Sequence, residues 1–197
     1  FTVEEILSLM IGPCSALVYL HSLSPPIYHG DLHDKNLVLT RSNTPICKIC
    51  DFGLSLISPT PSRNIYKAIK PPELGKTDSI YTSESDVFSF GVILYKLFCY
   101  QRLHDHITSE FVLVPEGDML NRHKYEPDTT IQFLKIIRQC VAEDPKQRVK
   151  IRNLLARLGA LKKELEAVSN TSQLSIAPLP VAMTTSPVMD EDVGYVE

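Results

Sequence analysis

The stretch from His29 to Gly53 reads HGDLHDKNLVLTRSNTPICKICDFG. It holds two short apolar runs, at 37–39 and 46–50, on either side of the turn-forming cluster 41–45. Apolar runs that are separated by turn residues in this way are typical of a β-hairpin. The stretch therefore predicts two neighbouring antiparallel strands whose outer ends come close together.

Three polar side chains lie near those strand ends. Asn36 comes directly before the first strand, Asp51 comes directly after the second, and Asp31 precedes Asn36 in the same loop. Carboxylate and amide oxygens suit Mg²⁺, which binds few protein oxygens and takes the rest from phosphate and water. A further carboxylate nearby could orient a hydroxyl nucleophile. Each residue alone could instead cap its own backbone in a turn, but the complete set in this order favours a functional site.

The order H-x-D-L-x-x-x-N, followed by D-F-G, resembles the catalytic loop and the metal-binding loop of eukaryotic-type protein kinases. The resemblance implies that Asp31 is the catalytic base and that Asn36 and Asp51 hold Mg²⁺ on the phosphates of ATP. It also implies that Val38 lies under the adenine of ATP, although a plain core position in a strand explains this valine equally well. The cofactors implied are therefore ATP and Mg²⁺.

Motifs further along the chain resemble the same family. Residues 85–97 are hydrophobic nearly all round, which predicts a buried helix, and they resemble the central helix of the kinase large lobe. There Asp86 would accept backbone N–H bonds from the catalytic loop; an acid favoured by the helix dipole is the alternative. Arg148, in the run DPKQR, would form a buried bridge to Glu73. The resemblance thus implies structural support from His29, Phe52, Gly53, Glu73, Asp86 and Arg148.

The composition is that of one substantial globular domain of 197 residues, 44% hydrophobic and 22% charged. A net charge of −3 gives no reason to expect nucleic acid or an anionic membrane as a partner. The most apolar stretch, 87–100, is too short to cross a bilayer and contains Lys96, and no signal peptide is visible. Five scattered cysteines predict a reducing, cytoplasmic setting. Cys47 and Cys50 are interpreted as strand packing rather than as a zinc site.

The expected fold class is mainly α with a small β-hairpin. Apolar residues at three- and four-residue steps predict helical structure over 3–23, with a kink or a division into two short helices at Gly12-Pro13. The resemblance implies a partial protein kinase domain over 1–165 that covers the C-terminal lobe only. Residues 166–197 include three prolines and an acidic end, and they are expected to form a disordered acidic tail.

The sequence lacks the elements with which a kinase N-terminal lobe clamps ATP. No G-x-G-x-x-G occurs, and residues 1–28 are too few to hold that lobe with its strand lysine and its helix glutamate. The N-terminal lobe is therefore absent from this chain and expected upstream. The fragment is expected to be inactive by itself.

Three positions depart from the common protein kinase pattern. Gly30 stands where an arginine usually receives an activation-segment phosphate, and His33 stands where serine/threonine kinases usually carry lysine. Lys35 occupies a position where tyrosine kinases often carry arginine. The activation segment, 51–73, would be a short irregular loop. The predicted function is transfer of the ATP γ-phosphoryl group to a serine or threonine hydroxyl of a protein substrate, with tyrosine left open.

Two alternative functions remain. Gly30 and His33 also resemble the catalytic loop of small-molecule phosphotransferases of the aminoglycoside and choline kinase type, but the downstream motifs favour a protein kinase. The second alternative is a pseudokinase that acts as a binding scaffold. The presence of all three polar residues of the catalytic set argues against it.

Overall fold

The computed structural model describes residues 1–57, 70–75, 79–99 and 127–174. These residues form four α-helices and two small antiparallel sheets of two strands each. The helices are α1 (Val3–Ser22), α2 (Ser83–Cys99), α4 (Pro127–Cys140) and α5 (Ile151–Leu174). The strands are β1 (Ile27–Tyr28), β2 (Leu37–Leu39), β3 (Cys47–Ile49) and β4 (Leu56–Ile57). Three short 3₁₀ helices are η1 (Asp34–Asn36), η2 (Pro72–Gly75) and η3 (Pro145–Gln147).

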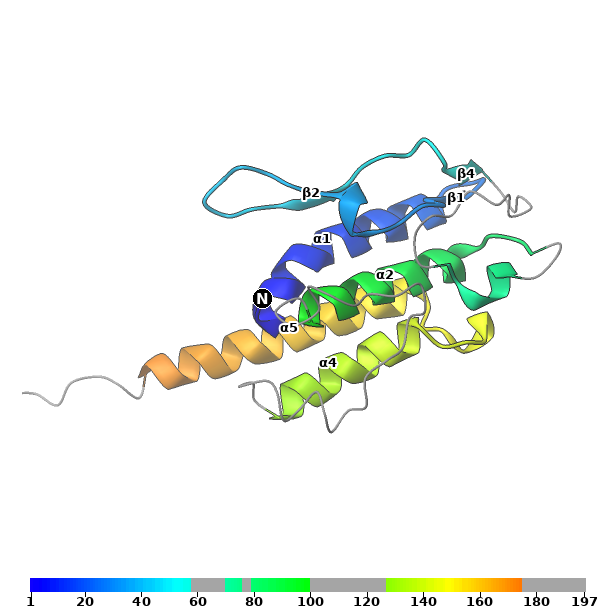
Figure 1. The fold of residues 1–197 in the computed structure, drawn as a ribbon. Helices are drawn as coiled ribbons and strands as arrows, with labels where there is room; N and C mark the ends of the chain where they lie inside the picture. The colour runs from blue at the N-terminus through cyan, green and yellow to red at the C-terminus, as the bar shows by residue number, and fades with distance from the viewer. Residues whose placement is uncertain (58–69, 76–78, 100–126, 175–197) are drawn as a thin grey trace, which may run out of the picture.

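Figure 1 shows both sheets on one side of the helices, next to α1. The expectation of a mainly helical chain with a small hairpin is confirmed.

Helix α1 is continuous, so the expected division into two helices at Gly12-Pro13 is wrong. The helix begins with a capping box, in which the Thr2 hydroxyl accepts the Glu5 N–H at 3.1 Å and the Glu5 carboxylate accepts the Thr2 N–H at 2.7 Å. Proline removes a single backbone hydrogen bond. Buried residues lie on both sides of Pro13, and Pro13 is itself buried. Packing of the whole face therefore outweighs the local cost of the proline.

Among the described residues, α1 is the one helix whose length and hydropathy would suffice to cross a membrane. Its apolar face is buried against other parts of the chain, with contacts to α5, α2 and β3. A core helix passes the same test of length and composition.

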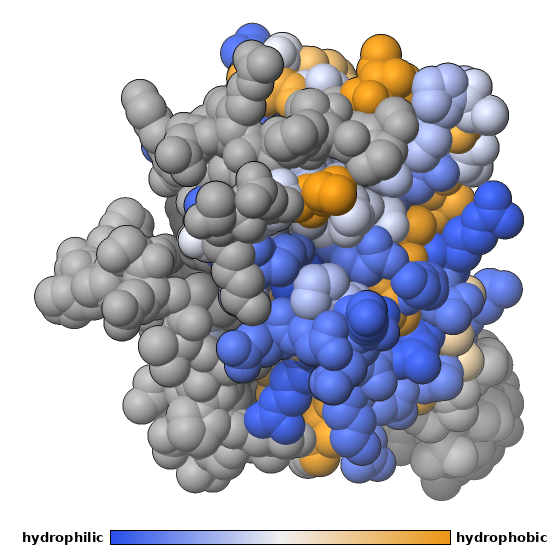
Figure 2. All heavy atoms as spheres, turned by 90° about the vertical axis from the view of Figure 1, so that its right-hand side faces the viewer, coloured by the Kyte–Doolittle hydropathy of each residue, from blue (hydrophilic) through white to orange (hydrophobic). Residues whose placement is uncertain are grey.

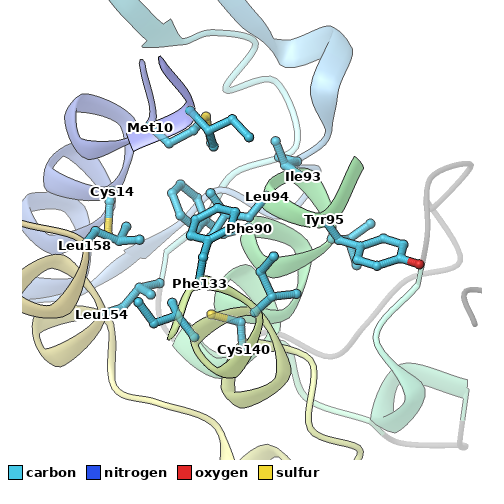
Figure 3. Close-up of a cluster of buried hydrophobic side chains, with 14 of the residues drawn as sticks. Met10, Cys14, Phe90, Ile93, Leu94, Tyr95, Phe133, Cys140, Leu154 and Leu158 are labelled. Carbon is cyan, nitrogen blue, oxygen red and sulfur yellow. The ribbon is translucent and has the colours of Figure 1, made fainter. Parts of the chain in front are cut away.

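Helix α2 is the centre of the hydrophobic core. Every residue from Ser85 to Tyr95 is buried, which confirms the prediction of a buried central helix. Figure 3 shows side chains from all four helices converging around Phe90, which is fully buried. Gly91 lies against α4 so closely that an added Cβ would be 2.4 Å from the Cβ of Cys140. A side chain at this position would therefore separate the two helices.

Helix α5 extends beyond the predicted end of the domain at residue 165. It continues to Leu174, so residues 166–174 are helical and their assignment to a disordered tail is wrong. Nζ of Lys162 lies 3.6 Å from Oε1 of Glu166 one turn away, which supports the helix here, although residues 168–172 are weaker helix formers. The remainder of the predicted tail, 175–197, lies outside the described residues.

The two sheets confirm one prediction and add one feature. Strands β2 and β3 form the predicted hairpin, with Leu37 opposite Ile49 and Leu39 opposite Cys47. Strand β4 pairs with β1, which the sequence analysis did not predict. This second sheet joins the segment after D-F-G to the segment before the catalytic loop. The predicted irregular loop of the activation segment falls largely outside the described residues.

Exposed apolar side chains gather on the strands. Figure 2 shows one face, on which the lower, helical part is largely hydrophilic and apolar groups are more frequent toward the strands at the top. In the two sheets and directly before β3, four large apolar residues are between 46% and 65% exposed. They are Val38, Leu39, Ile46 and Ile57. The interpretation of Val38 as a core residue is therefore wrong, since this side chain points away from the core.

Candidate active site

Hydrogen bonds of Asn36 bring the two predicted site loops together. Its side-chain amide donates to the carbonyl of Asp31 at 2.9 Å, and its own carbonyl accepts the N–H of Cys50 at 2.9 Å. Asn36 is buried, and it ends the short helix η1 directly before β2 begins. Asp51 follows Cys50 directly, so the structure places Asp31, Asn36 and Asp51 at one end of the hairpin, as predicted.

Asp51 has an unusual backbone conformation. Its φ of 61° lies in the left-handed region, which aspartate tolerates better than most residues because its side chain can hydrogen-bond locally. The N–H of Gly53 donates to its Oδ1 at 3.3 Å. A Cβ on Gly53 would lie 3.2 Å from the same oxygen, tighter than most real contacts. Glycine at this position therefore leaves room for the carboxylate, which remains exposed.

His29 contacts both loops. Its Nδ1 accepts the N–H of Asp31 at 3.3 Å, and its Nε2 donates to the carbonyl of Cys50 at 3.1 Å. Its ring lies 5.1 Å from the ring of Phe52, measured between centroids. The His29 side chain is fully buried, whereas Phe52 remains 46% exposed. These contacts fix the spacing between the loop that carries Asp31 and the loop that carries Asp51.

Asp86 anchors the start of the catalytic loop to α2. Its Oδ2 accepts the N–H of His29 at 2.8 Å, and its Oδ1 accepts the N–H of Gly30 at 3.3 Å. His21 on α1 and Tyr81 add hydrogen bonds to the same carboxylate, at 2.8 and 2.6 Å. The predicted backbone contacts are present. A fully buried carboxylate with four donors is held in one orientation and holds the loop in turn.

Gly30 explains one departure from the common kinase pattern. Its φ of 82° is a conformation that glycine adopts without strain and that side chains disfavour. In this conformation the N–H of Gly30 donates to Asp86. Glycine therefore forms the anchored turn without the strain that an arginine would bring.

The predicted bridge between Glu73 and Arg148 is present. The guanidinium contacts both carboxylate oxygens, at 2.7 and 2.6 Å. The Arg148 side chain is fully buried, and its guanidinium carbon lies 4.8 Å from the centre of the Phe88 ring. The hydroxyl of Ser85 also donates to Glu73, at 2.9 Å. The bridge ties Glu73, in η2 at the end of the activation segment, to the short connection between η3 and α5.

Two further contacts in the catalytic loop were not predicted. Nε2 of His33 lies 3.5 Å from Oδ2 of Asp31. Lys96 on α2 donates to Oδ1 of Asp34 at 2.8 Å. Burial alone raises the pKa of Asp34, but the hydrogen bond and charge of Lys96 outweigh it and lower this pKa overall. The sequence marks His33 as a departure from lysine and as part of the resemblance to small-molecule phosphotransferases, but it does not predict a contact with Asp31. No sequence pattern links Asp34 to a residue so far along the chain.

The residues present fit a magnesium ion. Because the amide nitrogen of Asn36 is engaged by the Asp31 carbonyl, its Oδ1 is the atom left for a metal. Asp51 supplies a carboxylate with one oxygen hydrogen-bonded to Gly53 and one free of that bond. Such a set of few hard oxygens is what Mg²⁺ uses beside phosphate. Within the described ranges, no group of three or more His, Cys, Asp or Glu side chains could hold a metal ion.

Comparison with known proteins supports the kinase resemblance. A sequence model of the protein tyrosine and serine/threonine kinase family matches residues 1–158. The chain is 28% identical to a putative mitogen-activated protein kinase kinase kinase 7-like protein of Drosophila melanogaster, over 81% of this chain and 42% of that protein. It is 30% identical to the serine/threonine-protein kinase CTR1 of Arabidopsis thaliana, over 85% of this chain and 21% of that protein. It is 32% identical to vascular endothelial growth factor receptor 2 of Mus musculus, over 84% of this chain and 12% of that protein. The chain thus spans less than half the length of these relatives. A family match that covers most of the chain, together with the Asp31, Asn36 and Asp51 arrangement, shows that this chain belongs to the protein tyrosine and serine/threonine kinase family.

Proposed function

We propose that the protein carrying this chain transfers the γ-phosphoryl group of ATP to a hydroxyl of a protein substrate. The observation that carries the proposal is the double engagement of Asn36, whose side chain bonds Asp31 and whose backbone bonds Cys50. These bonds support a site in which a candidate base and two candidate metal ligands would act together. Phosphoryl transfer needs this combination, because its catalysis rests on positioning and on neutralising the phosphate charge.

Each residue of the site has a distinct part in the proposed reaction. Asp31 orients the substrate hydroxyl and accepts its proton as the hydroxyl oxygen attacks phosphorus. Asn36 and Asp51 would hold Mg²⁺, which supplies neutralisation of the phosphate charge. His29 keeps the two loops at a fixed spacing, and Asp86 fixes the backbone before Asp31. Val38, being exposed beside the site, is available for the adenine.

We place the ATP clamp in a part of the protein outside this sequence. The exposed apolar residues on the strands support this placement, since a small lobe over the hairpin would cover them. The length of the relatives is in keeping with it, because each extends well beyond the matched region. The free state of all five cysteines supports an intracellular setting.

Serine or threonine is the favoured acceptor. Several relatives carry the name serine/threonine-protein kinase, including CTR1 of Arabidopsis thaliana. The matched family includes enzymes that act on tyrosine as well. Phosphoamino-acid analysis of the modified substrate would decide between the acceptors.

The test is a phosphate-transfer assay on the full-length protein with two site variants. We expect Asp31→Asn to abolish transfer and leave nucleotide affinity unchanged, because the base does not hold the metal. We expect Asp51→Asn to weaken binding of Mg·ATP itself, measured by calorimetry. Asp128→Asn removes an exposed carboxylate on α4 and is the matched control. Full activity in both site variants would contradict the assignment, and nucleotide binding without transfer in the wild type would favour the scaffold alternative.

A further inference from the structure

His33 lies beside the candidate base in a fixed orientation. Its Nε2 is 3.5 Å from Oδ2 of Asp31, and its Nδ1 accepts the backbone N–H of Lys35 at 3.2 Å. The second contact makes His33 the N-cap of η1, the short helix that leads to Asn36. The side chains of His33 and Asp31 are about equally exposed, at 21% and 20%. Both therefore border the place where a substrate hydroxyl would reach Asp31.

The contact with Lys35 decides which nitrogen of His33 carries the hydrogen. A nitrogen that accepts an N–H bond has no hydrogen of its own, so Nδ1 is the unprotonated nitrogen. In the neutral imidazole the hydrogen is then on Nε2, the atom that faces Asp31. The backbone contact therefore selects the tautomer whose N–H donor faces the base.

We propose that His33 is a positioning residue, whose Nε2–H holds Oδ2 of Asp31 so that Oδ1 is left to accept the proton of the substrate hydroxyl. The proposal rests on the proposed phosphoryl transfer and adds a residue to it. The separation of 3.5 Å is longer than an ordinary N–H···O bond. Hydrogen bonds of catalytic groups are often long in the free protein and shorten when substrate is bound.

Two carboxylates, those of Asp31 and Asp34, lie near His33. Lys96 on α2 is bonded to Asp34. In the tautomer with hydrogen on Nε2, Asp31 has an uncharged donor beside it, whereas an ammonium group in this place would weaken it as a base. A residue that orients Asp31 without neutralising it suits the transfer of a proton to that carboxylate.

Two substitutions separate the contacts of His33. In asparagine the amide reaches about as far as Nδ1 of histidine, so His33→Asn keeps the cap on η1 and loses the donor to Asp31. In glutamine the amide reaches about as far as Nε2, so His33→Gln keeps a donor for Asp31 and loses the cap. The variants are matched, since both are neutral amides that differ by one methylene group.

We expect the transfer rate to depend on the donor to Asp31, and the stability of the fold to depend on the cap of η1. In the full-length protein, His33→Asn should lower kcat roughly ten- to hundredfold with little change in KM for ATP, because a misplaced base slows the chemical step. His33→Gln should keep most of the wild-type kcat and unfold at lower temperature. The reverse order, with an active Asn variant and a slow Gln variant, would overturn the proposal and leave His33 a capping residue only.

A second measurement tests the orientation of His33 without relying on turnover. Nitrogen-15 NMR of the imidazole, assigned by loss of the signal in His33→Asn, should show a protonated Nε2 and an unprotonated Nδ1 at neutral pH. Asp31→Asn should shift the Nε2 signal. Protonation on Nδ1 would overturn the proposal. An inactive wild-type protein that shows the expected NMR signals would instead overturn the proposed function, so the two failures are distinguishable.

Discussion

Arg148→Ala is the substitution with the largest expected effect on stability. The guanidinium uses all five of its N–H donors on Glu73 and on three backbone carbonyls, those of Ala142, Glu84 and Glu143. Alanine removes every one of these donors at once. It leaves the Glu73 carboxylate, whose side chain is only 18% exposed, without its cation.

The magnitude follows from burial. Breaking a buried ion pair by removing one partner costs about 3–5 kcal/mol, because a charge is left in the interior without compensation. The Arg148 side chain has no exposed surface, so water has poor access to the space that alanine would leave. Water therefore solvates the Glu73 carboxylate poorly after the substitution. For a protein of this size such a loss lowers the midpoint of thermal unfolding by roughly 6–20 °C.

Thermal and urea unfolding followed by circular dichroism would measure this loss. Lys162→Ala is the matched control, because it removes a cation from an exposed pair on α5 and should change the free energy of unfolding by less than about 1 kcal/mol. Arg148→Lys should fall between alanine and wild type, since an ammonium group cannot contact both carboxylate oxygens and all three carbonyls. If Arg148→Ala and Lys162→Ala unfolded at the same temperature, the bridge between Arg148 and Glu73 would not contribute about 3–5 kcal/mol to the free energy of unfolding.

Two further predictions concern packing and pH. Gly91→Ala should destabilise the fold by about 1–3 kcal/mol, because the new methyl group would overlap Cys140 on α4; urea unfolding should show this, with Gly159→Ala, which has open space, as the control. Burial by itself raises the pKa of Glu84, but hydrogen bonds from Lys150 and Ser83 outweigh it and hold this pKa at about 2, below the ordinary 4.5. Glu84 therefore stabilises the fold fully above pH 4.5, and this contribution is lost as the pH falls toward 2. Glu84→Gln should flatten the dependence of the unfolding midpoint on pH in this range, and an unchanged slope would contradict the assignment.

Local sequence patterns predicted the hairpin, the helices and the polar set correctly where neighbouring residues determine the structure. The turn cluster after Leu39 sets the hairpin, and the all-round apolar run sets α2. The patterns failed where a distant contact decides. Proline predicts a break in α1, but burial along the whole face keeps the helix continuous. Strand β4 forms because β1 provides a partner, and two-residue strands carry no periodic signal.

In the candidate site, too, local sequence patterns predict some features, and contacts between distant residues determine the others. The kinase-like motif order pointed to Asp31, Asn36 and Asp51, and the structure brings them to one end of the hairpin. The motifs could not reveal that His21 and Tyr81 share the Asp86 carboxylate, since all three residues become neighbours only after folding. Contacts of this kind depend on tertiary packing rather than on local spacing.

The catalytic loop is attached to α2 at two places of unequal strength. Asp86 holds its beginning through buried hydrogen bonds, and Lys96 holds Asp34 through a pair whose carboxylate is 49% exposed. The two anchors are ten residues apart on one helix, a span of about 15 Å at the rise of an α-helix. Buried, fully satisfied bonds resist displacement, whereas an exposed pair contributes less than about 1 kcal/mol. We therefore expect the backbone at Gly30 to be fixed and the Asp34 side chain to adjust more readily. Asp31 lies between the two, which allows its carboxylate to settle against a substrate hydroxyl while its backbone stays in place.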